Sequence, residues 1–286
     1  MKDTQPLIRN ISDTARWVAI YRARETDRPD ALFRDPFARR LAGPRGEEIA
    51  STLALKRDDS WPWTTRTVLF DRFIAEQVAA GADMVVNLAA GLDSRPYRMD
   101  LPESLVWVEV DLPELLDEKE AALAGETPHC KLERIRLDLA NVAARRDLFD
   151  RLAARASKAL VVTEGLLIYL SSEEVAALAE DLAKPAGFHR WVFELVSPGL
   201  LKMLQKKMGG HLSQAGAPLK FAPPEGAAFF EPFGWKPLDI RSILKTAGQL
   251  KRLPFFLSLI SRLPEPKGPA GSRIWSAICL FGRTGR

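Results

Sequence analysis

Three carboxylates follow three predicted strands in this chain of 286 residues. Asp111, Asp138 and Glu164 stand at the ends of the predicted strands 105–110, 132–137 and 159–163. Because the carboxyl ends of parallel strands meet at one rim of a sheet, we expect the three side chains on that rim, where open α/β sheets bind ligands. Helix capping is an alternative role for Asp111, but it does not explain Glu164, whose next residues are apolar.

A glycine turn precedes the first of these acids. Gly91 follows the predicted strand Met84–Ala89 and stands twenty residues before Asp111. This arrangement suits a ribose, because a carboxylate accepts hydrogen bonds from both hydroxyls while a glycine lets the backbone approach the ligand. The pair therefore predicts a site for a nucleotide-like cofactor.

The turn itself distinguishes between two cofactors. A dinucleotide site needs a pattern such as GxGxxG, whereas this turn reads Ala89-Ala90-Gly91-Leu92-Asp93-Ser94-Arg95 and continues into Pro-Tyr-Arg. A nicotinamide-dependent oxidoreductase is thereby disfavoured. S-adenosylmethionine has no phosphate and carries two cationic groups, so acidic strand ends suit it better. Its own carboxylate needs a cation, for which Arg66 on the preceding helix is a candidate.

Alternating patterns predict the elements that position these residues. Helical patterns separate most of the strand candidates, which implies βαβ crossovers and a parallel sheet of the doubly wound α/β class. The expected strands are 84–89, 105–110, 132–137, 159–163, 190–196 and a final 274–281, which suggests an edge hairpin. The expected helices include 112–123, 141–156, 172–182 and 238–247. Residues 1–80 predict a helical cap, 81–286 the cofactor-binding domain, and the Gly- and Pro-rich 209–226 a mobile loop or lid.

Composition excludes several classes of protein. Two cysteines without a CxxC pattern indicate neither a disulfide framework nor a zinc site, and we expect no metal. The absence of a signal sequence and of a ~20-residue apolar run predicts a cytoplasmic protein with no membrane span. Residues 236–286 hold ten Lys/Arg against two acids. This is either a solvated basic face or a docking surface for an acidic substrate, carrier protein or membrane; nucleic acid is disfavoured because no binding motif accompanies it.

Five ordered phrases give the chain a family resemblance, strongest from Ser12 onward and weakest in 199–271. They read SDTARWVAIYRARETDRPDALFRDPFARRLAG, TTRTVLFD, VVNLAAGLDSRPYR, VEVDLPE and EGLLIYLSSEEV. They resemble the leucine carboxyl methyltransferase family, in particular its bacterial branch of S-adenosylmethionine-dependent O-methyltransferases, which includes polyketide carboxyl methyltransferases. The resemblance implies a seven-stranded, mostly parallel, class I methyltransferase-like (Rossmann-like) sheet with a variable insertion at about 199–271.

The resemblance also implies a role for individual residues. Arg66 would hold the cofactor's carboxylate and Gly91 would lie against its methionine part, while Glu164 would sit by the amino group. Asp111 would take the ribose hydroxyls, and Asp138 with Leu139 would flank the adenine. Ala89, Leu112 and, less securely, Arg16 complete the implied cofactor site. The family's first turn usually reads Gly-Ala-Gly, so Ala89 is a departure for which we expect closer packing rather than lost binding.

Sulfonium chemistry limits what the protein must add. The methyl group is already activated, so transfer mainly requires alignment and exclusion of water. A carboxylate acceptor is ionised at neutral pH and needs no base, which agrees with a chain that holds only three histidines. Tyr169 is a low-ranked candidate for the acceptor pocket, with a packed core tyrosine as the alternative. Arg16, Arg22 and Arg24 are candidate partners for the acceptor's carboxylate.

The sequence therefore predicts an O-methyltransferase acting on a small-molecule, carrier-borne or peptide-borne carboxylate. A hydroxyl acceptor, a protein C-terminal carboxylate and a non-catalytic cofactor-binding protein are the alternatives. The sequence does not indicate an oligomeric state.

Overall fold

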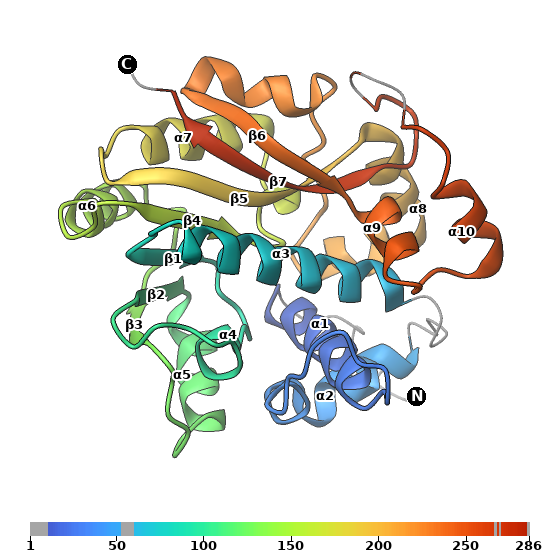
Figure 1. Cartoon of the computed structure of the whole chain (residues 1–286), viewed down its shortest axis with the longest axis horizontal. Helices are drawn as coiled ribbons and strands as arrows, with labels where there is room; N and C mark the ends of the chain where they lie inside the picture. The colour runs from blue at the N-terminus through green and yellow to red at the C-terminus, as the bar shows by residue number, and fades with distance from the viewer. Residues whose placement is uncertain (1–10, 53–59, 266–267, 269, 285–286) are drawn as a thin grey trace.

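Seven strands form a single mixed sheet in the computed structural model, which describes residues 11–52, 60–265, 268 and 270–284 (Figure 1). The order is β3-β2-β1-β4-β5-β7-β6, in which β7 runs antiparallel to both neighbours and the other contacts from β3 to β5 are parallel. The strands are β1 Met84–Leu88, β2 Val106–Asp111, β3 Lys131–Arg136, β4 Ala159–Thr163, β5 Phe188–Val196, β6 Trp235–Ser242 and β7 Ser276–Arg283.

Helices cover both faces of this sheet. They are α1 Ile11–Thr26, α2 Ala38–Thr52, α3 Trp61–Ala79, α4 Arg95–Arg98, α5 Pro113–Ala122, α6 Val142–Ala153, α7 Ser172–Ala183, α8 Pro198–Gln214, α9 Ile243–Gln249 and α10 Phe255–Ile260. Two 3₁₀ helices, η2 Leu167–Tyr169 and η3 Gly226–Phe233, connect them. No helix in the described part of the chain is long and apolar enough to cross a membrane.

The two faces of each strand explain how the core is divided. β1 is buried along its whole length, and its successive valines point to opposite sides of the sheet. Val85 packs with Phe70 and Phe73 of α3, whereas Val86 belongs to the cluster that contains Phe149 of α6. Continuous apolar strands of this kind are typical of a sheet that is covered on both faces.

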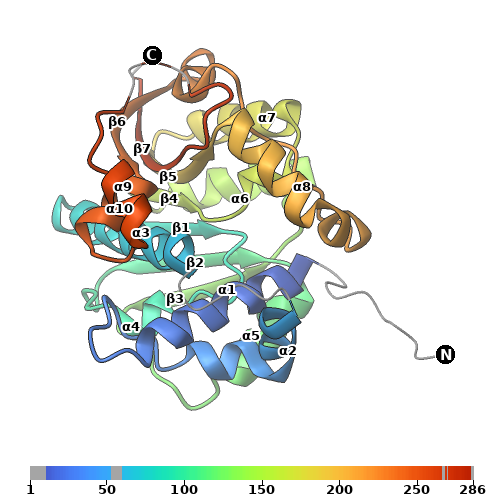
Figure 2. The same ribbon diagram turned by 90° about the vertical axis from the view of Figure 1, so that its right-hand side faces the viewer.

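The cap consists of α1 and α2, which pack closely against each other (Figure 2). Trp17 and Tyr21 of α1, Leu41 of α2 and Leu212 of α8 share one buried cluster. The N-terminal helices and a helix from the second half of the chain therefore stabilise each other beyond the edge of the sheet.

The strand predictions hold to within two residues at each end, but one helix prediction was wrong. The predicted helix 238–247 is the edge strand β6 as far as Ser242, and α9 begins only at Ile243. β6 is irregular between Pro237 and Asp239, where a proline without an N–H is tolerated. β7 lies between β5 and β6 and pairs antiparallel with β6 at the edge of the sheet, in agreement with the expected edge hairpin.

The predicted mobile loop at 209–226 is also largely ordered. α8 continues through Gly209 and Gly210 to Gln214, and the buried side chains of Leu219 and Phe221 anchor the chain that follows. Glycine inside a helix costs about 1 kcal/mol. Burial of Leu212 in the cap cluster offsets that cost.

Candidate functional site

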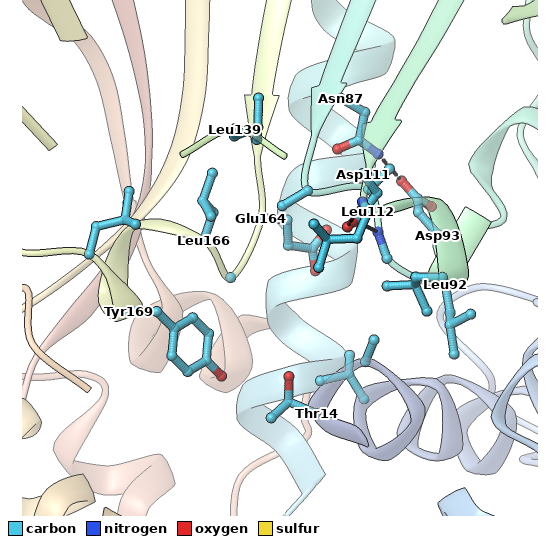
Figure 3. Close-up of a pocket in the computed structure, with 18 of the residues that line it drawn as sticks. Thr14, Asn87, Leu92, Asp93, Asp111, Leu112, Leu139, Glu164, Leu166 and Tyr169 are labelled. Carbon is cyan, nitrogen blue, oxygen red and sulfur yellow. Dashed lines mark hydrogen bonds between the residues drawn. The ribbon is translucent and has the colours of Figure 1, made fainter. Parts of the chain in front are cut away.

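A cavity of about 540 Å³ opens at the carboxyl ends of β1, β2 and β4, beneath α1 (Figure 3). This is the point at which the strand order reverses direction, and open α/β sheets bind their ligands there. The volume falls within the range of small-molecule sites, ~300–1,000 Å³. All but two of the residues that the sequence assigns to the cofactor or acceptor line this cavity, the exceptions being Arg16 and Arg24: the lining residues are Arg22, Arg66, Ala89, Gly91, Asp111, Leu112, Asp138, Leu139, Glu164 and Tyr169.

Asp111 is held in place by the glycine turn. The N–H of Gly91 donates to its Oδ2 at 2.6 Å, and the N–H of Leu112 donates to its Oδ1 at 2.8 Å. A carboxylate oxygen can accept two hydrogen bonds, so each oxygen keeps capacity for a ligand. Burial raises the pKa of Asp111, and the two backbone hydrogen bonds oppose that effect only in part. Asp111 is therefore an anchored acceptor at the cavity wall.

The turn brings its backbone close to both the cavity and the cap. Gly91 has φ +51°, and a Cβ added to it would lie 3.4 Å from the Cβ of Ala15 on α1. Ala89 also has a positive φ, +53°, where a side chain is strained. Position 89 is thus a place where glycine is favoured, and the methyl group of Ala89 fits there at an energetic cost.

The ends of β3 and β4 supply an apolar slot. Leu139 and Leu166 lie on the same side of the cavity, with Leu112 facing them from the end of β2 (Figure 3). Arg145 donates to the carbonyl of Leu139 at 3.0 Å and thereby fixes the loop after β3. Asp138 accepts from the N–H of Ala140 at 2.9 Å and is exposed at the slot's margin. A flat heteroaromatic ring fits between such side chains.

A chain of alternating charges crosses the other end of the cavity. Glu164 lies between two arginines, with Oε1 3.1 Å from Nε of Arg66 and Oε2 2.8 Å from a terminal nitrogen of Arg95. Arg66 also reaches Glu194 at the end of β5, at 3.1 Å. Burial alone would lower the pKa of Arg66, but the negative charges of Glu194 and Glu164 raise it by more than burial lowers it. The pKa therefore lies above its usual value and the guanidinium stays charged.

Arg95 continues this chain to two further acids. It contacts Asp93 at 2.8 Å and Asp71 on α3 at 2.6 Å. Burial raises the pKa of Asp93, yet Arg95 and then Lys119 more than offset this, so the pKa lies below the usual range. Asn87 donates to Asp93 at 2.8 Å from the end of β1. These contacts fix the charges on the cavity wall before any ligand binds.

Tyr169 and Thr14 approach each other from opposite sides of the cavity (Figure 3). Tyr169 ends η2, and its hydroxyl interacts with Thr14 of α1. Burial raises the pKa of Tyr169, and the hydrogen bond with Thr14 opposes this only in part. Tyr169 therefore lines the cavity as a neutral hydroxyl.

The predicted arginines of α1 divide into two groups. Arg22 lines the cavity, where it contacts Asp35 at 2.8 Å and donates to the carbonyl of Leu92 at 2.5 Å. Arg16 is not among the lining residues; it forms an ion pair with Glu118 of α5 instead. Arg24 pairs with Glu47 at 3.6 Å and is not a lining residue either.

Comparison with known proteins assigns the chain to a family. The leucine carboxyl methyltransferase family model matches residues 15–183, more than half of the chain. The chain belongs to the leucine carboxyl methyltransferase family. Two curated relatives from Mycobacteroides abscessus and Mycolicibacterium paratuberculosis, both named "Putative S-adenosyl-L-methionine-dependent methyltransferase", are 35% and 37% identical over 63% and 65% of this chain. The chain spans 63% and 66% of their own lengths.

Solved structures agree with the fold at low sequence identity. A DUF574 family protein from Streptomyces avermitilis matches with a TM-score of 0.61 and 14% identity, over 95% of this chain and 97% of the other. A protein from Thermobifida fusca described as a "putative methyltransferase" matches with a TM-score of 0.58 and 14% identity, over 98% and 96%. The Rossmann-like class I methyltransferase fold that the sequence implies is therefore confirmed.

Several lining residues of this family member were missed from the sequence. Asp93 and Arg95 belong to the phrase VVNLAAGLDSRPYR, yet no role was predicted for either of them. Thr14 comes from α1, whose register against the sheet is a tertiary property. An Asp-x-Arg pattern directly after the glycine turn was the one available signal. In the described part of the chain, no three His, Cys, Asp or Glu side chains are grouped to hold a metal ion.

Proposed function

We propose that this chain is an S-adenosylmethionine-dependent O-methyltransferase that esterifies a carboxylate of a small molecule, such as a polyketide-like or carrier-borne metabolite. The observation that carries the proposal is the composition of the cavity wall. The lining residues include acids at strand ends and arginines between them, but no histidine or lysine in the described part of the chain. Such a wall can orient charged ligands, and it lacks the imidazole that most often serves as a general base near neutral pH.

The cofactor's parts match the residues that line the cavity. Asp111 can still accept hydrogen bonds from the ribose hydroxyls. Gly91 has no Cβ, so a ligand can approach its backbone more closely than it could approach any other residue. Leu112, Leu139 and Leu166 suit the adenine, with Asp138 at its margin. When bound, the cofactor supplies a methyl group that its sulfonium has already activated.

The methionine end carries both an ammonium and a carboxylate. Arg66 and Glu164 offer one charge of each sign, 3.1 Å apart. We expect the cofactor's carboxylate to accept hydrogen bonds from Arg66, while Glu164 faces the cofactor's ammonium group. Because Glu194 already contacts Arg66, it can hold the guanidinium in place as the cofactor enters.

The acceptor end favours a nucleophile that is ionised in advance. The pKa of Tyr169 is raised by burial, so its hydroxyl donates a hydrogen bond rather than taking a proton. A carboxylic acid with a pKa near 4 is deprotonated without help. Trp17 and Trp63, whose ring centroids are 5.1 Å apart, form an apolar wall suited to the acceptor's hydrocarbon part.

Calorimetric titration tests the cofactor assignment. We expect binding of S-adenosylmethionine and of its demethylated product, and no heat with NAD; binding of NAD alone would overturn the proposal. The bond formed is tested separately with methyl-labelled cofactor and a panel of aliphatic and aromatic carboxylic acids. A methyl ester releases its label in mild base, whereas a base-stable product would assign an ether or an amine instead.

A further inference from the structure

α10 lies at the outer edge of the molecule, beside α9 (Figures 1 and 2). Phe255 is 82% exposed and Phe256 70%, and none of the residues of α10 is buried. Leu259 follows Phe255 and Ile260 follows Phe256 at intervals of four, so the helix places the members of each pair on one side, as an apolar stripe, and Leu263, which is 62% exposed, comes just beyond the helix. Large exposed apolar patches mark binding surfaces in soluble folds.

The side of α10 that faces the protein carries two serines and one leucine. Leu257, Ser258 and Ser261 are half-buried, and a Cβ on Gly248 of α9 would collide with the hydroxyl of Ser261. α10 is therefore fixed to α9 through serine and glycine, which allow a close approach. An ordinary surface helix buries its apolar side and exposes its polar side. In α10, by contrast, most of the apolar side chains are exposed.

Basic residues flank this stripe at both of its ends. Residues 240–264 contain five Lys or Arg and no Asp or Glu. Arg241 and Arg252 form ion pairs with acids elsewhere in the chain. Lys251 and Arg262 flank α10 at either end, are exposed, and form no ion pair within the described ranges.

We propose that α10 docks on the surface of an anionic lipid bilayer. Phe255, Phe256 and Leu259 would insert at the boundary between headgroups and acyl chains, where aromatic side chains are favoured. Lys251 and Arg262 would then lie near the lipid phosphates. The charges argue against a second copy as the occupant, because a two-fold contact through the same stripe would bring like cations together without a carboxylate from 240–264 to compensate them.

Vesicle co-sedimentation of the full chain tests the proposal. We expect binding to equimolar phosphatidylcholine–phosphatidylglycerol vesicles that is at least about tenfold stronger than binding to phosphatidylcholine alone, because each basic residue near an anionic surface contributes about 1 kcal/mol. Phe255→Ser/Phe256→Ser should reduce the partition coefficient at least about tenfold through loss of apolar insertion. Lys251→Gln/Arg262→Gln should remove most of the preference for the anionic lipid.

Leu238→Ser is the matched control, because Leu238 is 55% exposed on β6 and lies outside the stripe. It should bind like the native protein, and all variants should keep the native thermal unfolding midpoint. Absence of binding to anionic vesicles, or equal binding by the double phenylalanine variant, would overturn the proposal. A dimer in analytical ultracentrifugation that this variant dissociates, without vesicle binding, would assign the stripe to a second copy instead.

Discussion

Asp111 shows how far a single residue can be interpreted from sequence. Its place after a strand, twenty residues beyond Gly91, predicted a ribose-binding carboxylate, and the structure adds the direct hydrogen bond between the two residues. Glu164 was harder to interpret. Its position at a strand end was predicted, but its contact with Arg95 was not. Which acid a buried arginine contacts depends on the conformation of its side chain in the folded protein, and residue spacing in the sequence does not specify that conformation.

The first prediction concerns Asp111→Asn. An amide places an N–H₂ group against one of the two backbone donors, and it removes the charge that would receive the ribose hydroxyls. We expect affinity for the demethylated cofactor to fall at least about tenfold, since hydrogen bonds to a charged group contribute about 1.5–3 kcal/mol. Calorimetry measures this, with Asp138→Asn as the control, because Asp138 is exposed and should lose less. Native affinity in a folded Asp111→Asn variant would remove the residue from the site.

The pH dependence of binding follows from the same carboxyl. Burial raises the pKa of Asp111 above 3.8, and only the ionised form accepts a hydrogen bond at both oxygens. Cofactor affinity should therefore be full at neutral pH and fall on acidification, beginning at a higher pH than an exposed aspartate would cause. This decline should be absent in Asp111→Asn.

At the scale of elements, the sheet could be predicted because its central strands are apolar on both faces. β6 could not, because Leu238 and Ile240 are 55% and 41% exposed and do not face the core. Together with Ile243 and Ala247, the outward-facing Ile240 gives intervals of three and four residues, which is the spacing expected of an amphipathic helix. Similarly, Gly209 and Gly210 indicated a loop, whereas packing of Leu212 against the cap keeps the helix continuous. In both cases tertiary contacts outweighed local pattern.

The second prediction separates two arginines of α1. Arg22 joins the cap to the glycine turn through Asp35, which is fully buried, and through the carbonyl of Leu92. Arg22→Met should lower the free energy of unfolding by about 3 kcal/mol or more, because it leaves a buried carboxylate with fewer partners. Arg16→Met removes only a partly exposed pair and should cost about 1 kcal/mol or less.

Urea unfolding of both variants measures the difference, and calorimetry adds a second readout. Arg22→Met should also weaken cofactor binding, because the turn at Leu92 loses its contact with α1. Arg16→Met should bind the cofactor with native affinity, since its side chain does not line the cavity. Loss of binding in a stable Arg16→Met variant would restore the role that the family resemblance implied.

At the scale of the whole molecule, the cavity wall combines a sheet rim with side chains from the helices α1 and α3. The rim could be predicted because parallel strands place their ends together. The share of the two helices could not, because it depends on how α1 and α3 pack on the rest of the chain. Trp17 and Trp63 lie 46 residues apart in sequence and meet only in the folded protein. For this reason the sequence assigns the methyl donor more sharply than the acceptor.

The pH profile of methyl transfer tests the acceptor class for the molecule as a whole. The pKa of both Arg66 and Arg95 is raised and that of Asp93 is lowered, so these wall groups keep one charge state around neutrality. The pKa of Tyr169 is raised above 10.0, which places its ionisation outside the same range. A carboxylate acceptor is also fully ionised above about pH 6. With saturating cofactor and an acid from the labelled panel, the rate should be level between about pH 6 and 9. An acceptor hydroxyl that must lose a proton would instead make the rate rise by up to tenfold per pH unit, which would exclude direct attack by a carboxylate.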